Sequence, residues 1–256
     1  WHGGEPQVAV HGSDVVVVWP EEDNTGVYRN PATGTLNTAV GTVVGYANDP
    51  AFSRCGLAIS HDGGRTFRRT TLPAQTAQST LCSDAITAFG PHGELYAGTI
   101  TFNQPTTPLP MIPPGTLPHL SPAQPGQGSA DVVISSRDRG ETWSNPPVDA
   151  IGNRGAAAER YAPGSNPPRG GEGTSDRPFM SVDQSTGTLF LTASADLIQF
   201  NGTTETRSFV TASTNGGRSF GVVYAVDDPH WPQSGGIATI AAVAGRLVVA
   251  YPGSDP

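Results

Sequence analysis

The sequence has no lysine, little charge and few aromatic residues, and these shortages exclude several classes of protein. All 14 basic residues are arginine, against 22 acidic residues, for a formal net charge of −8. Binding to nucleic acid or to an anionic membrane needs clustered positive charge, which this chain lacks. No apolar run approaches the ~18 residues that a transmembrane helix needs. Neither a nucleic-acid partner nor a membrane span is therefore expected.

Long helices and metal-ligand motifs are also missing. Glycine (32 residues) and proline (24 residues) interrupt a chain of 256 residues every few positions. The six histidines never occur in pairs at metal-ligand spacing, so no cofactor is expected. A structural calcium ion held by loop carbonyls would leave no sequence signal. With 36% hydrophobic and 14% charged residues, the chain can form one well-buried domain.

Three eight-residue segments repeat along the chain. Their shared pattern is S-x-D/N-x-G-x-T/S-aromatic, and they occupy residues 60–67, 136–143 and 213–220. Asp or Asn at the third position accepts bonds from the amides of its own turn, and glycine supplies the positive φ that closes a hairpin. The final aromatic residue re-enters a strand and packs inward. These rings, which we predict to be buried, are Phe67, Trp143 and Phe220.

A second repeat precedes each of these turns. It consists of two apolar runs around a short turn, at about residues 5–19, 84–97, 177–191 and 237–249. Each unit then contains an inner hairpin followed by an outer hairpin, which makes four antiparallel strands. Four-stranded units that repeat around an axis form a β-propeller, so the predicted fold class is all-β. The expected units span about 5–72, 84–145 and 177–226, with a partial unit at 237–256.

The eight-residue pattern resembles the Asp-box, or BNR, repeat that is typical of the sialidase superfamily. The resemblance covers nearly the whole chain and implies a six-bladed propeller, of which three units and one inner hairpin are visible. The chain is therefore expected to be part of a longer protein. The implied function is a secreted, exo-α-sialidase-like glycoside hydrolase that acts on the terminal sugars of glycans.

The predicted chemistry lies opposite the repeated turns. The long connections, about 20–54, 103–130 and 145–176, leave the units at that face, and the inner strands begin there. Their first residues should surround the mouth of a central channel. Arg177 would bind an anionic or hydroxyl group, and Asp84 would act as an acid or a hydrogen-bond acceptor. The candidate catalytic residues are Asp84, Asp176 and Arg177.

Two of the long connections have alternative interpretations. Residues 103–130 form either a polyproline excursion over the surface or a lid over the channel. Residues 145–176 form either a solvated loop or an arm that reaches the mouth. The candidate ligand-binding residues are Glu5, Arg160, Tyr161 and Glu172. Asp62, Asp138 and Asn215 belong to the turns at the opposite face, and their expected role is structural.

Sialidase chemistry uses three arginines on a carboxylate, an acid, and a tyrosine nucleophile beside a glutamate. The family's first arginine opens the first inner strand, where this chain has Glu5. Three hypotheses therefore stay open: a sialidase-like hydrolase, a non-catalytic propeller that binds glycan or protein, and an enzyme with paired carboxylates. The carboxylates of the third hypothesis are Glu5, Asp84 and Asp176.

The two cysteines, Cys55 and Cys82, are either independent buried thiols or one disulfide. In the predicted topology both lie at the same end of adjacent units, and we expect a disulfide that joins the first unit to the second. The chain opens at Trp1, as expected of a mature or trimmed chain. These features predict a location outside the cytoplasm: secreted, periplasmic or at the cell surface.

Overall fold

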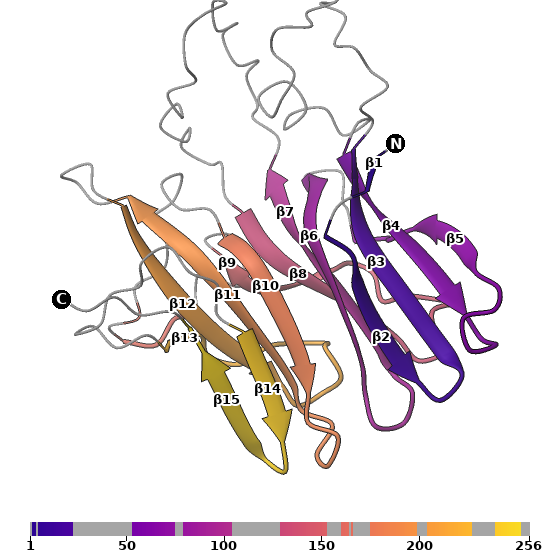
Figure 1. Cartoon of the computed structure of the whole chain (residues 1–256). Helices are drawn as coiled ribbons and strands as arrows, with labels where there is room; N and C mark the ends of the chain where they lie inside the picture. The colour runs from indigo at the N-terminus through magenta and orange to yellow at the C-terminus, as the bar shows by residue number, and fades with distance from the viewer. Residues whose placement is uncertain are drawn as a thin grey trace, which may run out of the picture.

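The computed structural model describes residues 2–3, 5–22, 53–74, 79–103, 129–152, 160–163, 165, 175–198, 204–226 and 239–251. Within these residues the regular structure consists of strands, without a helix. The strands form three antiparallel sheets and one hairpin, which follow one another in chain order (Figure 1). The prediction of an all-β fold built from four-stranded antiparallel units is confirmed at the level of the sheets.

The first sheet has an inner strand in two pieces. β1 (His2–Gly3) and β2 (Gln7–His11) both pair with β3 (Asp14–Glu22), and β4 (Ser53–Ser60) and β5 (Arg68–Thr71) complete the sheet. The second sheet has the order β6 (Ser79–Phe89), β7 (Leu95–Asn103), β8 (Ser129–Ser136) and β9 (Val148–Gly152). Its last strand lies beyond residue 145, where the sequence predicted that the second unit ends.

The third sheet has the order β10 (Ser175–Val182), β11 (Leu189–Ile198), β12 (Thr204–Ser213) and β13 (Tyr224–Ala225). The final hairpin pairs β14 (Thr239–Val243) with β15 (Arg246–Ala250). β6 begins five residues before Asp84 and β10 begins two residues before Arg177, because pairing continues on both sides of an irregularity at each of these residues.

Alternating side chains explain why the sheets stack. In the Val15–Val18 run of β3, Val16 and Val18 are fully buried, and their partners on β4 are Ile59 and Leu57. These four residues pack into one core with residues of the second sheet, and a second core joins the second sheet to the third. Full burial of each such side chain contributes about 1.5–3 kcal/mol, so the sheets are joined by apolar packing.

A disulfide also joins the first two sheets. Cys55 lies in β4 and Cys82 in β6, with 5.7 Å between their Cα atoms. This separation is within the range that a disulfide spans without backbone distortion. The predicted disulfide between the first and second units is confirmed.

The sheets have two different ends. We call the end that carries residues 60–67, 136–143 and 213–220 the turn end, and the end where β2, β6 and β10 begin the mouth end. In each of the three turns, a serine hydroxyl accepts a glycine amide: Gly64 N–H to Ser60 at 2.9 Å, Gly140 N–H to Ser136 at 2.8 Å and Gly217 N–H to Ser213 at 3.0 Å. The three turns therefore share one conformation.

The carboxylates of the acidic residues in these turns accept hydrogen bonds from groups of the same turn. Asp62 accepts the Thr66 amide at 2.9 Å and hydroxyl at 2.7 Å, and Asp138 accepts the same two groups from Thr142. Bonds from the Thr66 and Thr142 hydroxyls and amides lower the pKa of Asp62 and of Asp138 to about 2. These contacts give both aspartates a structural role.

The aromatic residues that end the turns differ in burial. Phe220 is 6% exposed, and Trp143 packs against the core between the first two sheets. The predicted burial of Phe67 is wrong, because Phe67 is 46% exposed. Trp143 and Phe220 each pack into the core shared with the preceding sheet, and no sheet precedes the first one among the described residues. The turn sequence alone does not supply the surface that covers the ring.

Candidate functional site

Three residues occupy the same position at the mouth end of three sheets. Glu5 lies between β1 and β2, while Asp84 and Arg177 lie where β6 and β10 change register with their neighbours. Each inner strand is therefore interrupted at an equivalent point. Such irregularities re-aim side chains away from the regular alternation of a strand.

The backbone at these three positions is unusual. Glu5, Asp84 and Arg177 have φ values of 43°, 45° and 48°, in the left-handed region that residues other than glycine rarely adopt. Each such residue costs about 1–3 kcal/mol and persists only where its surroundings impose it. A strained conformation that recurs in three sheets marks this end of the inner strands as the candidate site.

Contacts between the three residues cross all three sheets. The Arg177 backbone N–H donates to Asp84 Oδ2 at 3.1 Å, and Arg177 Nη1 lies 3.6 Å from Glu5 Oε1. The Ser83 hydroxyl donates to Asp84 Oδ1 at 3.0 Å and orients the same carboxylate. Because the second sheet lies between the other two in the stack, the Glu5–Arg177 contact indicates that the inner strands converge at this end.

This arrangement can bind a polar ligand. The side chains of Arg177 and Glu5 are 46% and 57% exposed, so the ion pair faces solvent. Exposed ion pairs contribute about 0–1 kcal/mol, so a ligand anion can replace Glu5 on the guanidinium at little cost. Arg177 can then bind a carboxylate or hydroxyl group, while Glu5 and Asp84 can accept hydrogen bonds from sugar hydroxyls.

Other predicted site residues are placed differently or lie outside the described residues. Asp176 pairs with Ser194 in the β10–β11 ladder, directly before the irregularity at Arg177. Glu172 lies outside the described residues, as do most of the long connections. The two interpretations of residues 103–130, a polyproline excursion or a lid, therefore stay predictions. The two interpretations of residues 145–176, a solvated loop or an arm that reaches the mouth, also stay predictions.

Arg160 and Tyr161 bind the outer strands of the second and third sheets. The Arg160 guanidinium donates to the carbonyls of Asp149 at 2.8 Å and Ala150 at 2.6 Å, and also to that of Gly221. Burial lowers the pKa of the Arg160 guanidinium. These contacts place Arg160 between two sheets, whereas Glu5, Asp84 and Arg177 lie at the starts of inner strands.

Tyr161 has a similar environment. Its ring meets Phe209 edge-on with 5.2 Å between centroids, and its hydroxyl accepts the Gly152 N–H at 3.4 Å. Burial raises the pKa of the Tyr161 hydroxyl above its ordinary value, which keeps the phenol protonated at neutral pH. The observed contacts of both residues are structural, and their ligand-binding role stays a prediction.

The first sheet holds one polar cluster that the sequence did not predict. The Glu21 carboxylate, 2% exposed, accepts from Trp19 Nε1 and Arg54 Nε, each at 2.8 Å, and also pairs with Arg69. The Arg69 guanidinium stacks on the Trp19 ring at 5.2 Å from its centroid. Burial raises the pKa of Glu21, but Arg69 and Arg54 lower it further, so the net shift is downward. The run of Trp19, Pro20 and Glu21 contained no periodic signal for this cluster.

Within the described residues, no group of three or more His, Cys, Asp or Glu is placed to hold a metal ion. In the same part of the chain, no helix is long and apolar enough to cross a membrane.

Comparison with known proteins identifies the fold but no family. No protein-family model and no curated protein matches the sequence. Among solved structures, the Hadza microbial sialidase Hz136 aligns at 14% identity and a TM-score of 0.51, over 98% of this chain and 41% of that one. A mutant of Trypanosoma rangeli sialidase with trans-sialidase activity aligns at 12% identity and a TM-score of 0.51, over 98% of this chain and 34% of that one.

The chain thus spans less than half the length of both sialidases. At these identities the likeness concerns the fold alone. The sheets of this protein are arranged as part of a sialidase-like fold.

Proposed function

We propose that this protein is a sialidase-like glycoside hydrolase that acts on terminal sugars of glycans, with its site at the mouth end. The observation that carries the proposal is the meeting of Glu5, Asp84 and Arg177 from three sheets. Arg177 binds an anionic or hydroxyl group of the sugar, and Asp84 acts as acid or hydrogen-bond acceptor. Asp176, the next residue along β10, is a further candidate.

We also propose that the sheets belong to a closed, six-bladed propeller in a longer protein. Apolar side chains on the outermost sheets support this part of the proposal. Val8 and Val10 are exposed on the first sheet, and Val243 and Val248 are exposed on the final hairpin. In a closed ring, neighbouring sheets would cover both surfaces, and the inner strands would surround a central channel.

The proposed location is outside the cytoplasm. Disulfides persist in oxidising compartments, and the Cys55–Cys82 bond supports this location. The proposed chemistry uses side chains alone, without a cofactor.

A non-catalytic propeller that binds glycan or protein is the alternative function. It is favoured by Glu5, which stands where the sialidase pattern has an arginine and which pairs with Arg177. The paired-carboxylate hypothesis uses Glu5, Asp84 and Asp176 at the same end. The alternatives differ in a simple respect: a binding protein retains glycans without cleaving them.

The test combines hydrolysis of a chromogenic sialoside with binding on a glycan array, using the 256-residue protein and two variants. Arg177→Ala removes the guanidinium, and Asp84→Asn removes the charge while keeping a residue type that tolerates positive φ. Both variants should lose hydrolysis, or binding if the protein is non-catalytic, with nearly unchanged melting temperatures. Arg246→Ala, at an exposed position in the final hairpin, is the matched control.

Wild-type hydrolysis that both variants lose would support the enzyme. Glycan binding without hydrolysis, lost in both variants, would support the alternative. Full activity or binding in both variants would show that the mouth end is not the site.

A further inference from the structure

The turn end contains a cavity that the proposed function does not use. It lies between the second and third sheets and has a volume of about 580 Å³, which is within the usual size range of small-molecule sites. Its lining includes Glu94, Tyr96, Arg137, Gly216 and Arg218. These residues come from the inner hairpin of the second sheet and from the repeated turns of both sheets.

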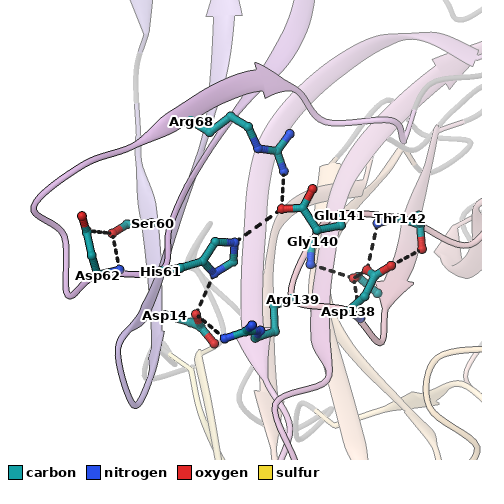
Figure 2. A network of polar contacts seen from close by, with 11 residues as sticks. Asp14, Ser60, His61, Asp62, Arg68, Asp138, Arg139, Gly140, Glu141 and Thr142 are labelled. Carbon is teal, nitrogen blue, oxygen red and sulfur yellow. Dashed lines mark hydrogen bonds and ion pairs between the residues drawn. The ribbon is translucent and has the colours of Figure 1, made fainter.

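At the equivalent junction between the first and second sheets, the same turn positions carry groups of complementary charge, and these groups form hydrogen bonds and ion pairs with one another. His61, the second residue of the first turn, lies 2.7 Å from Asp14 through Nδ1 and 3.5 Å from Glu141 through Nε2 (Figure 2). Arg139 pairs with Asp14 at 3.5 Å, and Arg68 pairs with Glu141 at 3.0 Å. Polar groups of two sheets therefore satisfy one another there.

Four members of this network have counterparts at the second junction. By position in the repeated turns, Arg137 corresponds to His61, Gly216 to Arg139, and Arg218 to Glu141. Glu94 corresponds to Asp14, because the residue after each pairs with the first serine of its turn: Leu95 with Ser136, and Val15 with Ser60. The same positions of the fold can therefore be compared directly.

At the second junction, the residues at these equivalent positions differ both in the charge of their side chains and in the space that the side chains occupy. His61 and Glu141 attract each other, whereas Arg137 and Arg218 carry like charges and cannot pair. Gly216 replaces Arg139, which removes a side chain from the junction. One carboxylate, Glu94, then lines the cavity together with two guanidinium groups, and none of the three forms an ion pair with another described residue. The cavity has an excess of positive charge.

Tyr96 adds a hydrogen-bond donor to this site. The residue is 3% exposed, and its hydroxyl lies 3.7 Å from the position that a Cβ on Gly216 would occupy. The hydroxyl has no hydrogen-bond partner among the described residues. Burial and the Glu94 carboxylate raise the pKa of Tyr96, while Arg137 lowers it, so the phenol is protonated at neutral pH. Because Tyr96 lines the cavity, its hydroxyl can donate to a ligand oxygen there.

We propose that this cavity binds a small hydroxylated organic anion, a sugar that carries a carboxylate or a sulfate group. Arg137 and Arg218 bind the oxyanion; the Nε of Arg218 already donates to the Asn215 carbonyl at 2.8 Å, which orients its guanidinium. The Tyr96 hydroxyl and the Glu94 carboxylate bind hydroxyl groups of the sugar. This site lies at the opposite end of the sheets from Asp84 and Arg177 and is independent of them.

Isothermal titration calorimetry on the 256-residue protein tests the proposal with four probes: glucuronate, glucose 6-sulfate, glucose and inorganic sulfate. Glucuronate, glucose 6-sulfate or both should bind saturably, while glucose and sulfate should bind at least about tenfold more weakly. The two anionic sugars distinguish a carboxylate from a sulfate ligand. Failure of both to bind, or equal affinity for glucose or for sulfate, would overturn the proposal.

Variants locate the binding. Arg137→Ala and Arg218→Ala should each weaken it at least about tenfold, because each removes a charge-assisted contact. Arg218→Glu should abolish it, because the carboxylate would pair with Arg137 as Glu141 pairs with His61. Arg65→Ala, which removes the arginine at the same turn position in the first sheet, should have no effect. The losses in Arg137→Ala and Arg218→Ala should persist in an Arg177→Ala background, which separates this site from the mouth end. Unchanged affinity in both alanine variants of the cavity would overturn the assignment.

Discussion

The two ends of the sheets use polar residues in opposite ways. At the turn end of the first two sheets, Asp62 and Asp138 are enclosed by bonds from their own turns, and His61 joins the sheets through Asp14 and Glu141. At the mouth end, Glu5, Asp84 and Arg177 keep strained backbones and a solvent-facing ion pair. Polar groups that satisfy one another stabilise the fold, whereas groups held in strained and accessible positions can exchange a partner for a ligand.

The largest expected effect on stability comes from the disulfide near the mouth end, and it can be compared with the contribution of the hydrogen-bonded turns. Changing Cys55→Ser and Cys82→Ser together opens a loop with a sequence separation of 27 residues. The chain-entropy relation predicts a loss of about 3–4 kcal/mol in the free energy of unfolding. Urea unfolding measures it, and hydrogen exchange should rise around Cys82 before it rises at Gly64 and Thr66. A loss below about 1 kcal/mol would contradict the assigned role of the disulfide.

The next effect tests the turn end. Ser136 is buried, and its hydroxyl accepts the Gly140 amide at 2.8 Å and donates to Asp138 at 2.7 Å. Ser136→Ala leaves these groups without their partner and should cost about 1–3 kcal/mol. Thermal unfolding is the measurement. Thr214→Ala, at an exposed turn position, should stay within about 0.5 kcal/mol of wild type. Equal stability of the two variants would show that the turns do not stabilise the fold as described.

A smaller effect depends on pH. Glu21→Gln leaves Arg54 and Arg69 without their carboxylate, and because both arginines are partly exposed we expect a loss of about 1–2 kcal/mol at pH 7. The folded protein lowers the pKa of Glu21 below 4.5, so its stabilisation is present above that pH and is lost as the pH falls. Unfolding followed by tryptophan fluorescence at pH 7 and pH 3 should therefore show a difference in stability between wild type and variant that shrinks in acid. A difference that grows in acid would contradict the assignment.

The smallest effect concerns strain at the mouth end. Glu5 has a φ of 43°, which glycine adopts without a steric penalty. Glu5→Gly should therefore raise the free energy of unfolding by about 0.5–1 kcal/mol, although it removes an exposed ion pair with Arg177. Differential scanning calorimetry is the measurement. Gly216→Ala, where φ is 74°, should instead destabilise the protein. Destabilisation by Glu5→Gly would show that the ion pair outweighs the strain.

Local chemistry made much of the fold predictable. The S-x-D/N-x-G pattern specifies its own turn, because Ser60 and Asp62 each accept a hydrogen bond from an amide four residues further along the chain. The apolar alternation of each inner hairpin likewise specifies its strands. The predicted topology favoured the disulfide, because Cys55 and Cys82 lie near the starts of strands at the same end of adjacent sheets.

Longer-range features were beyond the sequence. Burial of Phe67 depends on a neighbouring sheet rather than on its own turn, so the same motif gave a buried Phe220 and an exposed Phe67. Arg160 and Tyr161 were grouped with the mouth because they lie in a long connection, but their contacts are with outer strands. The Glu5–Arg177 contact depends on how the inner strands converge, which no local pattern encodes.

The most direct test of the proposed site is a crystal structure of the Asp84→Asn protein with a sialic acid-terminated trisaccharide. We predict that the terminal sugar lies at the mouth end, with a carboxylate or hydroxyl oxygen within ~3.2 Å of the Arg177 guanidinium and with Glu5 displaced from it. A sugar bound elsewhere, with Arg177 still paired to Glu5, would contradict the claim that these three residues form the functional site.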